Sequence, residues 1–289
     1  YNAIKFMGGH GAQKVIKSAK RMLKMEILRA QAQRPPKIRA ALFDFDGTIS
    51  TLRTGWEKVM RELMLKWLGG GRTPTRALCQ EVDGYIDEST GIQTIHQMKW
   101  LAAKAHALRP EAPEDPWFYK AEYNQSLMEN VARRRDGVAS GQLNREDFLI
   151  SGAEAFLRAL KERGVRLMVA SGTDHPDVLR EVEALGLKDY FDGVYGAPVG
   201  EESCSKERVI RQLLREENLP ESQLAVVGDG KVEIALGREA GARTLGMATD
   251  EKARRGVSPV KRERLIRAGA EAIAGDFAEL EALLDFLGL

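Results

Sequence analysis

The sequence is poor in the residue types that disulfide-bonded, membrane-spanning and histidine-metal proteins need. Its 289 residues include two cysteines, Cys79 and Cys204, too few for a disulfide framework, and we expect both to be free, buried thiols in a reducing cytoplasm. No apolar run approaches the ~18 residues of a membrane helix, and the amino terminus lacks the apolar stretch of a secretory signal. His96 and His106 lie on one predicted helix without converging, which argues against a histidine metal site. These absences favour a cytoplasmic protein with no membrane span.

Length and composition are those of a globular protein with about two domains. Hydrophobic residues make up 43% of the chain and charged residues 30%. At roughly 150 residues per domain, 289 residues are enough for a sizeable core and one further domain. The chain has no internal repeat and no low-complexity segment.

Positive charge is concentrated at the amino terminus. Residues 1–39 hold ten Lys/Arg and one acid, a net charge of +9, whereas residues 40–289 carry −7. We predict that residues 1–37 form a basic amphipathic helix and a proline-containing linker. Such a helix could contact nucleic acid, an anionic membrane or a partner, but we favour packing on the protein's own surface and do not expect a nucleic-acid partner. The predicted apolar stripe is Val15, Ala19, Met22, Leu23, Ile27 and Ala30.

Two carboxylates follow the first predicted core strand. The apolar run 40–43 leads into Asp44-Phe45-Asp46-Gly47-Thr48. Positions i and i+2 of a strand share a face, so Asp44 and Asp46 would crowd one side of its carboxyl end. That crowding makes physical sense if a hard cation lies among the oxygens, or if one carboxyl holds a proton. The alternative is an acidic turn, in which Gly47 adopts a positive φ and Thr48 caps a helix.

Three later segments favour the functional interpretation. A second predicted strand, 165–170, ends in Ser171-Gly172-Thr173, where hydroxyl and backbone N–H groups could hold a phosphate. Lys206 opens a predicted helix, although a lysine at a helix start is usually solvated. A further strand, 224–228, is followed by Asp229 and, one helical turn later, by Glu233.

Taken in order, these four segments resemble the four motifs of the haloacid dehalogenase superfamily of phosphohydrolases. The resemblance covers roughly residues 38–50 and 150–289. It implies that Asp44 is the nucleophile, Asp46 the general acid and base, and Lys206 the group that neutralises charge. Phosphoryl oxygens would be held by Thr48, Ser171, Gly172 and Lys206, and Arg53, which precedes the predicted cap helices, is a further candidate.

The resemblance also implies a magnesium site. Its ligands would be Asp44, the backbone carbonyl of Asp46, and Asp229. Glu233 departs from the family pattern, in which the last acid is usually aspartate, and its longer arm leaves direct or water-mediated ligation open. A carboxylate that attacks an anionic phosphate needs such positive charge nearby, and the metal would also orient the attacking oxygen. The second carboxylate of the first motif argues against the dehalogenase branch, which lacks it.

The long interval between the first two motifs predicts an inserted domain. Asp44 and Ser171 are 127 positions apart, and the residues between them have helical periodicity. We predict an α-helical cap at 52–149, with helices at 56–67, 74–86, 92–108 and 117–131. By resemblance to the branch with such a cap, it would exclude water and select the substrate.

The rest of the chain predicts an α/β core at 38–51 and 150–289. Strands near 40–45, 165–170, 193–196, 224–228 and 243–247 alternate with helices near 152–163, 176–186, 206–217 and 231–240. Such alternation is typical of a doubly wound, Rossmann-like parallel sheet whose sites lie at the carboxyl ends of the strands. An edge strand at 270–274 and a helix at 277–287 complete the prediction.

We therefore predict a Mg²⁺-dependent phosphomonoester hydrolase that acts on a small phosphorylated metabolite through an aspartyl phosphate. One alternative is an intramolecular phosphotransferase of the same superfamily, a sugar phosphomutase, which needs the same motifs. Another is a binding module that uses the basic amino-terminal helix, but the complete motif set weighs against it. The oligomeric state is not predictable from these patterns.

Overall fold

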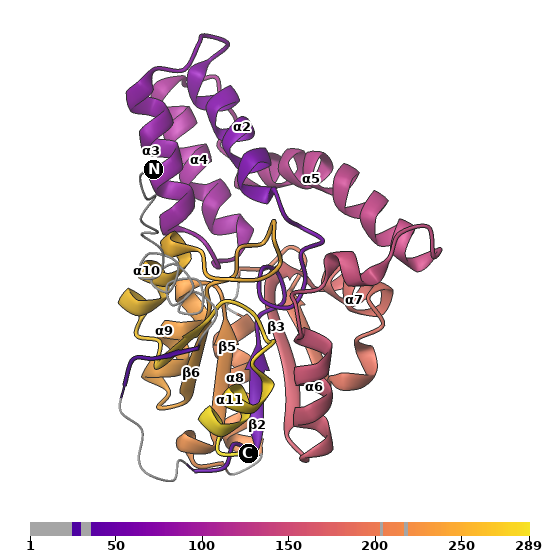
Figure 1. The fold of residues 1–289 in the computed structure, drawn as a ribbon. Coiled ribbons are helices and arrows are strands. Elements are labelled where there is room, and N and C mark those ends of the chain that lie inside the picture. The colour runs from indigo at the N-terminus through magenta and orange to yellow at the C-terminus, as the bar shows by residue number, and fades with distance from the viewer. Residues whose placement is uncertain (1–24, 30–35, 203–204, 217–218) are drawn as a thin grey trace, which may run out of the picture.

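A seven-stranded sheet forms the centre of the molecule. The computed structural model describes residues 25–29, 36–202, 205–216 and 219–289. The strand order is β1-β7-β6-β5-β2-β3-β4, and every pairing is parallel except the one between β1 and β7 (Figure 1). The strands are β1 (Glu26–Ile27), β2 (Ala40–Phe43), β3 (Arg166–Asp174), β4 (Gly193–Ala197), β5 (Leu224–Gly228), β6 (Arg243–Met247) and β7 (Ala272–Ala274).

Strand β2 is central because both of its faces are apolar. Ala41 and Phe43 lie in one hydrophobic cluster, and Ala40 and Leu42 lie in another on the opposite face of the sheet. All four side chains are buried. A strand that is apolar on both faces is typical of a parallel sheet covered by helices on both sides.

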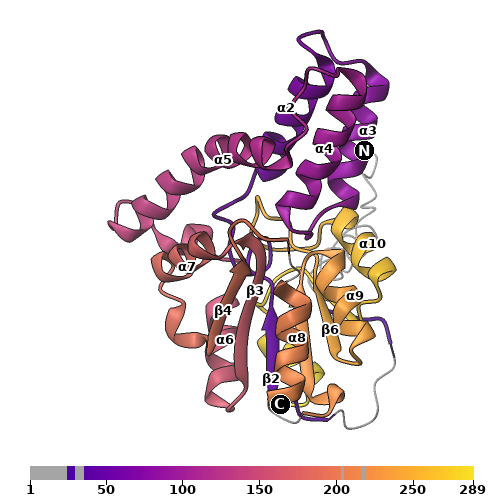
Figure 2. The same ribbon diagram turned by 180° about the vertical axis from the view of Figure 1, so that it is seen from behind.

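Helices cover both faces of the sheet, which confirms the predicted doubly wound α/β fold (Figure 2). From β2 the chain moves outward through β3 and β4, and then returns to β5 and moves outward through β6 and β7 on the other side. The switch point between β2 and β5 is where such folds place their sites. The core helices are α6 (Ala153–Glu162), α7 (His175–Ala184), α8 (Ser205–Glu216), α9 (Lys231–Glu239), α10 (Pro259–Ala268) and α11 (Leu280–Phe286), with 3₁₀ turns at Arg145–Phe148, Lys188–Tyr190 and Glu221–Gln223.

Between β2 and β3 the chain forms four helices, which we call the helical insert. These are α2 (Trp56–Gly69), α3 (Arg76–Glu88), α4 (Thr94–Leu108) and α5 (Pro116–Ala139). They have a hydrophobic cluster of their own, which includes Met60, Leu101 and Tyr119. Helix α5 continues past the predicted end at residue 131, because Arg134 of its last turns donates to the carbonyl groups of Leu52 and Thr54.

The helical insert lies over the carboxyl ends of the strands (Figures 1 and 2). Lys120 of α5 forms an ion pair of 2.6 Å with Asp174 at the end of β3. On the other side, Arg264 of α10 forms an ion pair of 3.0 Å with Asp87 of α3. These contacts hold the insert against the core, so the predicted site lies between the two.

The amino-terminal segment differs from its prediction. Residues 26–27, placed by periodicity on an amphipathic helix, form instead the edge strand β1, paired with Ile273 and Ala272 of β7. Glu26 also forms a salt bridge of 2.7 Å with Arg262, and Ile27 is 52% exposed, so it is not on a buried stripe. Pairing with a sheet edge overrides the local helical pattern. The rest of the predicted stripe lies outside the described residues.

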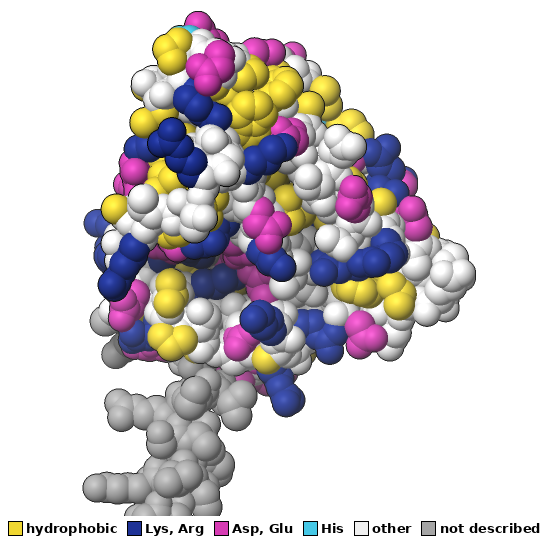
Figure 3. Space-filling view, turned by 90° about the horizontal axis from the view of Figure 1, so that it is seen from above, with side chains coloured by type: hydrophobic (Ala, Val, Ile, Leu, Met, Phe, Trp, Pro, Cys, Tyr) yellow, Lys and Arg dark blue, Asp and Glu magenta, His cyan; other side chains and the backbone are white. Residues whose placement is uncertain are grey.

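Within the described ranges, the helices are all too short or too polar to cross a membrane. Seen from above, the molecule carries positive and negative side chains interspersed over the same face (Figure 3). The half-buried Cys79 is a free thiol, whereas Cys204 lies outside the described residues.

Candidate active site

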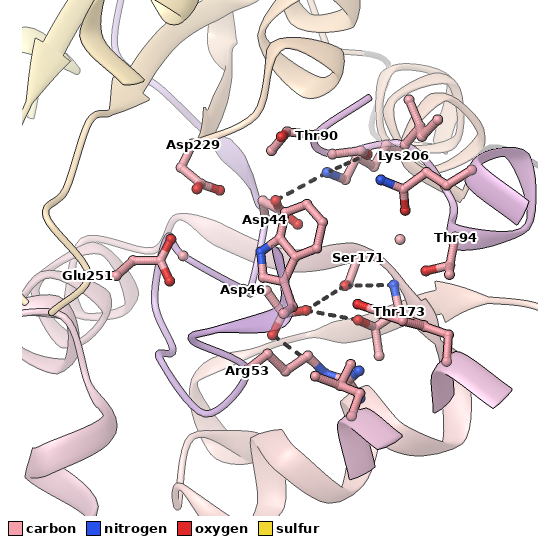
Figure 4. Close-up of a pocket in the computed structure, with 18 residues that line it drawn as sticks. Asp44, Asp46, Arg53, Thr90, Thr94, Ser171, Thr173, Lys206, Asp229 and Glu251 are labelled. Carbon is pink, nitrogen blue, oxygen red and sulfur yellow. Dashed lines mark hydrogen bonds and ion pairs between the residues drawn. The ribbon is translucent and has the colours of Figure 1, made fainter. Parts of the chain in front are cut away.

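The four predicted motifs meet in one pocket at the switch point of the sheet. Asp44 follows β2, Ser171 lies near the end of β3, and Asp229 follows β5, while Lys206 reaches the same point from α8. The pocket has a volume of about 100 Å³ and is lined on one side by residues of the helical insert. Figure 4 shows the motif side chains converging from these separate elements.

Lys206 connects two of the predicted acids. Its Nζ lies 3.1 Å from Asp44 Oδ2 and 2.7 Å from Glu233 Oε2. The other oxygen of Glu233 accepts a hydrogen bond from the backbone N–H of Gly230. All three side chains are buried, with Lys206 only 3% exposed. Glu233 therefore orients Lys206 toward Asp44, a role that requires a tertiary contact.

Burial and charge act together on these groups. Burial raises the pKa of Asp44 well above its usual range, and Glu233, Asp229 and Asp46 raise it further, against the lowering effect of Lys206. Burial alone would lower the pKa of Lys206, but the carboxylates of Asp44 and Glu233 outweigh it and raise the pKa. Lys206 therefore stays protonated, and the carboxylates around it still carry unbalanced negative charge.

The two carboxylate oxygens of Asp46 differ, because one accepts two hydrogen bonds and the other accepts none among the described residues. Its Oδ2 accepts hydrogen bonds from the hydroxyl groups of Thr173 at 2.9 Å and Ser171 at 3.3 Å (Figure 4). The Oδ1 atom is buried and has no hydrogen-bond partner among the described residues, with Arg53 Nε at 3.8 Å. The backbone N–H of Thr173 donates to Ser171 Oγ, which orients that hydroxyl. The two hydroxyl groups therefore fix the direction of this carboxyl group, and its other oxygen faces Arg53.

Asp229 is held from two sides. Thr48 donates to its Oδ1 at 3.3 Å, and Lys261 of α10 donates to its Oδ2 at 2.6 Å. Lys261 also binds Glu251 at 2.6 Å, and these two carboxylates raise its pKa despite burial, which lowers it. Gly47, with a φ of +73°, lies so close that a Cβ there would collide with Asp229 Oδ2. The glycine is therefore required for Asp229 to approach the first motif.

Of the predicted phosphate-binding residues Thr48 and Gly172, Gly172 lines the pocket and Thr48 does not. Thr48 is fully buried and is not among the pocket-lining residues, so its position favours holding Asp229 rather than contacting a phosphate. Gly172 does line the pocket, and a Cβ at this position would lie 3.1 Å from the carbonyl oxygen of Ile92 in the helical insert. A side chain at residue 172 would therefore press on the insert.

Arg53 is buried beside Asp46 and is bound by an acid that sequence reasoning missed. Its Nη2 lies 2.6 Å from Glu181 Oε1 of α7, and its Nε donates to both oxygens of Glu181. Asp177, on the same helix, lies 3.8 Å away. Burial raises the pKa of Glu181 to about 7, although Arg53 acts to lower it.

The acids fit a hard divalent cation. Ligand oxygens of Asp44, Asp229 and Glu233 all lie within 4.8 Å of one another and are buried. Oxygen-only donor sets of this kind suit Mg²⁺. Burial and, after it, the neighbouring carboxylates raise the pKa of Asp44, and a bound cation would favour its ionised form.

Comparison with known families agrees with this geometry. Residues 38–241 match the family described as haloacid dehalogenase-like hydrolase. The chain belongs to the haloacid dehalogenase-like hydrolases. The family resemblance predicted from the four motifs is thereby confirmed, as is the prediction that the chain is an enzyme of the hydrolase class.

Relatives of this hydrolase include phosphatases. It is 31% identical over 135 residues to a phosphoglycolate phosphatase of Rhodospirillum rubrum, a match that covers 47% of this chain and 52% of that protein. The matched region thus spans about half the length of this curated relative. Among solved structures, β-phosphoglucomutase from Clostridium difficile superposes with a TM-score of 0.60 at 16% identity, over 86% of this chain and 97% of that one. A predicted phosphoglycolate phosphatase from Haemophilus somnus superposes with a TM-score of 0.59 at 17% identity, over 86% and 98%. At these identities the two structures establish the fold alone.

Sequence reasoning missed four residues of this site. Thr173 was part of the quoted motif, and its hydroxyl at a strand end was an available signal. Glu181, Glu251 and Lys261 lie on helices or loops where charged residues are usually solvated, so no local pattern distinguished them. Only their burial against motif residues identifies them.

Proposed function

We propose that this hydrolase cleaves small phosphate monoesters through an aspartyl phosphate formed on Asp44. The observation that carries the proposal is the pair of carboxyl groups at the pocket. Asp44 lies beside the protonated Lys206, and Asp46 lines the same pocket with one oxygen that has no hydrogen bond among the described residues. One carboxylate is thus placed to attack an anion, and the other to move a proton.

In the first step, a carboxylate oxygen of Asp44 attacks phosphorus and the bond to the ester oxygen breaks. The leaving alkoxide takes a proton from Asp46, whose Oδ1 is free of other hydrogen bonds among the described residues. Lys206, the hydroxyl of Ser171 and the backbone of Gly172 would bind the phosphoryl oxygens, because all three line the pocket. The products of this step are a free alcohol and an aspartyl phosphate.

In the second step, Asp46 acts as a base. Having lost its proton to the alkoxide, it removes a proton from a water molecule that attacks the phosphorus of the aspartyl phosphate. The bond between phosphorus and the Asp44 oxygen then breaks, which releases phosphate and restores the carboxylate. Proton transfers of this kind typically contribute ~10²–10⁴-fold to a rate.

We further propose that Mg²⁺ is the cofactor. It would be held by Asp44, Asp229 and the backbone carbonyl of Asp46, with Glu233 as a further candidate ligand that also positions Lys206. When bound, the ion would offset the negative charge of the phosphoryl group and of the carboxylates. Lys261 and Thr48 keep Asp229 directed toward this position.

The size of the pocket favours a small substrate and a capping role for the helical insert. A volume of about 100 Å³ has room for roughly eight water-sized groups. Closure by the insert would exclude bulk water and select the ester by its alcohol. The volume of the pocket therefore supports a small ester as the substrate.

The test is phosphate release from a panel of small phosphate esters by the purified protein with Mg²⁺. We expect turnover of two- and three-carbon esters, and a loss of more than ~10³-fold in Asp44→Asn, because an amide cannot act as the nucleophile. The asparagine is close in volume to the aspartate, so circular dichroism should still show a folded protein. Phosphate release by a well-folded Asp44→Asn protein at the wild-type rate would reject the mechanism.

A further inference from the structure

The positive charges that line the pocket are already paired. Among the described residues, the cationic side chains of the lining are Arg53 and Lys206. Lys206 is bound by Asp44 and Glu233 and faces the position of the transferring phosphoryl group. Arg53 lies on the other side of Asp46, so it is the cation placed to meet the leaving group.

Glu181 cancels the charge of Arg53. It contacts the guanidinium through both carboxylate oxygens and has no solvent-exposed surface. Asp177 and Asp46, each 3.8 Å from the guanidinium, add further negative charge around it. A bidentate contact of a buried guanidinium leaves little of its charge to attract a second anion.

The remainder of the pocket wall on the insert side is uncharged. Apart from Arg53, every residue between β2 and β3 that lines the pocket from residue 52 onward is neutral, including the large apolar side chains of Trp56, Ile92 and Leu127. Glu251, which lines the opposite side, is bound by Lys261 and by the hydroxyl of Thr54. The space beyond Asp46 therefore offers no unpaired cation among the described residues.

From this arrangement we propose that the enzyme prefers phosphate esters of small uncharged alcohols, and that Glu181 determines this preference by neutralising Arg53. The proposal rests on the proposed phosphatase function and adds the chemical class of the leaving group. An ester with a carboxylate next to the phosphate would place a second anion beside Glu181 and Asp46 without an available cation. An ester with an ammonium group would lose its hydration against apolar side chains and lie beside the guanidinium of Arg53, while Asp46 is engaged with the ester oxygen.

Three esters of nearly equal size test the preference directly. They are 2-hydroxyethyl phosphate, 2-phosphoglycolate and 2-aminoethyl phosphate, which differ chiefly in the charge of the group beyond the ester carbon. The assay should be run about one pH unit above the pKa of Glu181, which is about 7, so that this carboxylate is ionised. We expect kcat/KM for the hydroxyethyl ester to exceed that of each charged ester by at least about tenfold. Equal or higher kcat/KM for either charged ester would overturn the proposal.

Glu181→Gln tests the role of that residue. The amide keeps the shape of the side chain but not its charge, so Arg53 would attract a substrate carboxylate. We expect the ratio of kcat/KM for 2-phosphoglycolate to that for 2-hydroxyethyl phosphate to rise by about tenfold. This ratio is unaffected by a change in the fraction of folded or active enzyme. The matched control is Glu183→Gln on the same helix, where Glu183 pairs with Lys188 on the surface and should leave the ratio unchanged.

The outcomes separate this inference from the proposed function. Hydrolysis of all three esters with an unchanged ratio in Glu181→Gln would overturn the role of Glu181 and leave the phosphatase function in place. If Glu181→Gln does not fold, the wild-type order of the three esters still decides the preference. Absence of phosphate release from every ester, with Mg²⁺ and with acetyl phosphate as an activated substrate, would reject the phosphatase function and the preference with it.

Discussion

Replacement of Lys206 by methionine should affect stability and catalysis in a way that depends on metal. The substitution keeps an unbranched side chain of similar length and removes the charge. It leaves Asp44 and Glu233, which are 6% and 1% exposed, without the cation that now lies 3.1 and 2.7 Å from them. Removing one partner of a buried ion pair typically costs ~3–5 kcal/mol, because the remaining charge is left uncompensated. We expect a loss of this size in the free energy of unfolding of the metal-free protein.

The assay is chemical denaturation in excess EDTA, followed by tryptophan fluorescence. The matched control is Lys66→Met, because Lys66 is 64% exposed and pairs with Glu122 at the surface, where such a pair contributes about 1 kcal/mol or less. Adding Glu233→Gln to Lys206→Met should recover part of the loss, since it removes one of the two unpaired carboxylates. Mg²⁺ should also reduce the difference from wild type, because the ion would offset the same charge.

The kcat of Lys206→Met should also fall, because the substitution removes the positive charge beside Asp44. Lys206 is the cation nearest to Asp44, and removal of one such electrostatic contact typically lowers kcat by ~10²–10³-fold. A free energy of unfolding within about 1 kcal/mol of wild type in EDTA would refute the reasoning, since it would mean that the two carboxylates do not depend on Lys206. Wild-type stability of both Lys206→Met and the double variant with Glu233→Gln would also refute it.

Three further outcomes are expected. Burial raises the pKa of Glu181 from 4.5 to about 7, so the folded protein binds a proton at this residue more tightly than the unfolded chain does. As pH rises from about 4.5 to 8, the free energy of unfolding of wild type, measured by urea denaturation, should therefore fall by roughly 2–3 kcal/mol relative to that of Glu181→Gln. Parallel pH profiles of the two proteins would contradict this. Truncation of residues 1–36 should lower the thermal midpoint without changing kcat more than about twofold, since β1 and the Glu26–Arg262 salt bridge are lost but no pocket residue is removed. Chelation should abolish turnover, and Mg²⁺ at about 100 times its Kd should stabilise the protein by ~2.7 kcal/mol; an unchanged thermal midpoint with Mg²⁺ would reject the metal site.

The alternation of strands and helices in the core was predictable from the sequence. Runs such as 224–228 are apolar on both faces and short, which is typical of strands buried in a parallel sheet, and their carboxyl ends were therefore the expected place for Asp44, Ser171 and Asp229. These features depend on neighbours along the chain. Local periodicity and turn residues report them directly.

The partners of the motif residues were not predictable in the same way. Arg53 and Glu181 are 128 positions apart, and Lys261 and Asp229 are 32 apart, yet each pair is in contact. A charged residue on a helix has the same local pattern whether it faces water or a buried carboxylate. The prediction of a helix at residues 26–27 was wrong for the same reason, since the pairing of these residues with β7 brings together segments that are far apart in the chain.

The sequence by itself thus determined the α/β class, the order of the elements and the acids placed at strand ends, because side-chain periodicity and turn chemistry act over a few residues. Only the tertiary structure decided how those acids are charged and oriented. Glu233 directs Lys206, Thr48 and Lys261 hold Asp229, and Glu181 neutralises Arg53. Each of these contacts forms in a buried space shared by separate elements, where weak screening makes the pairing strong and where no single segment contains both partners.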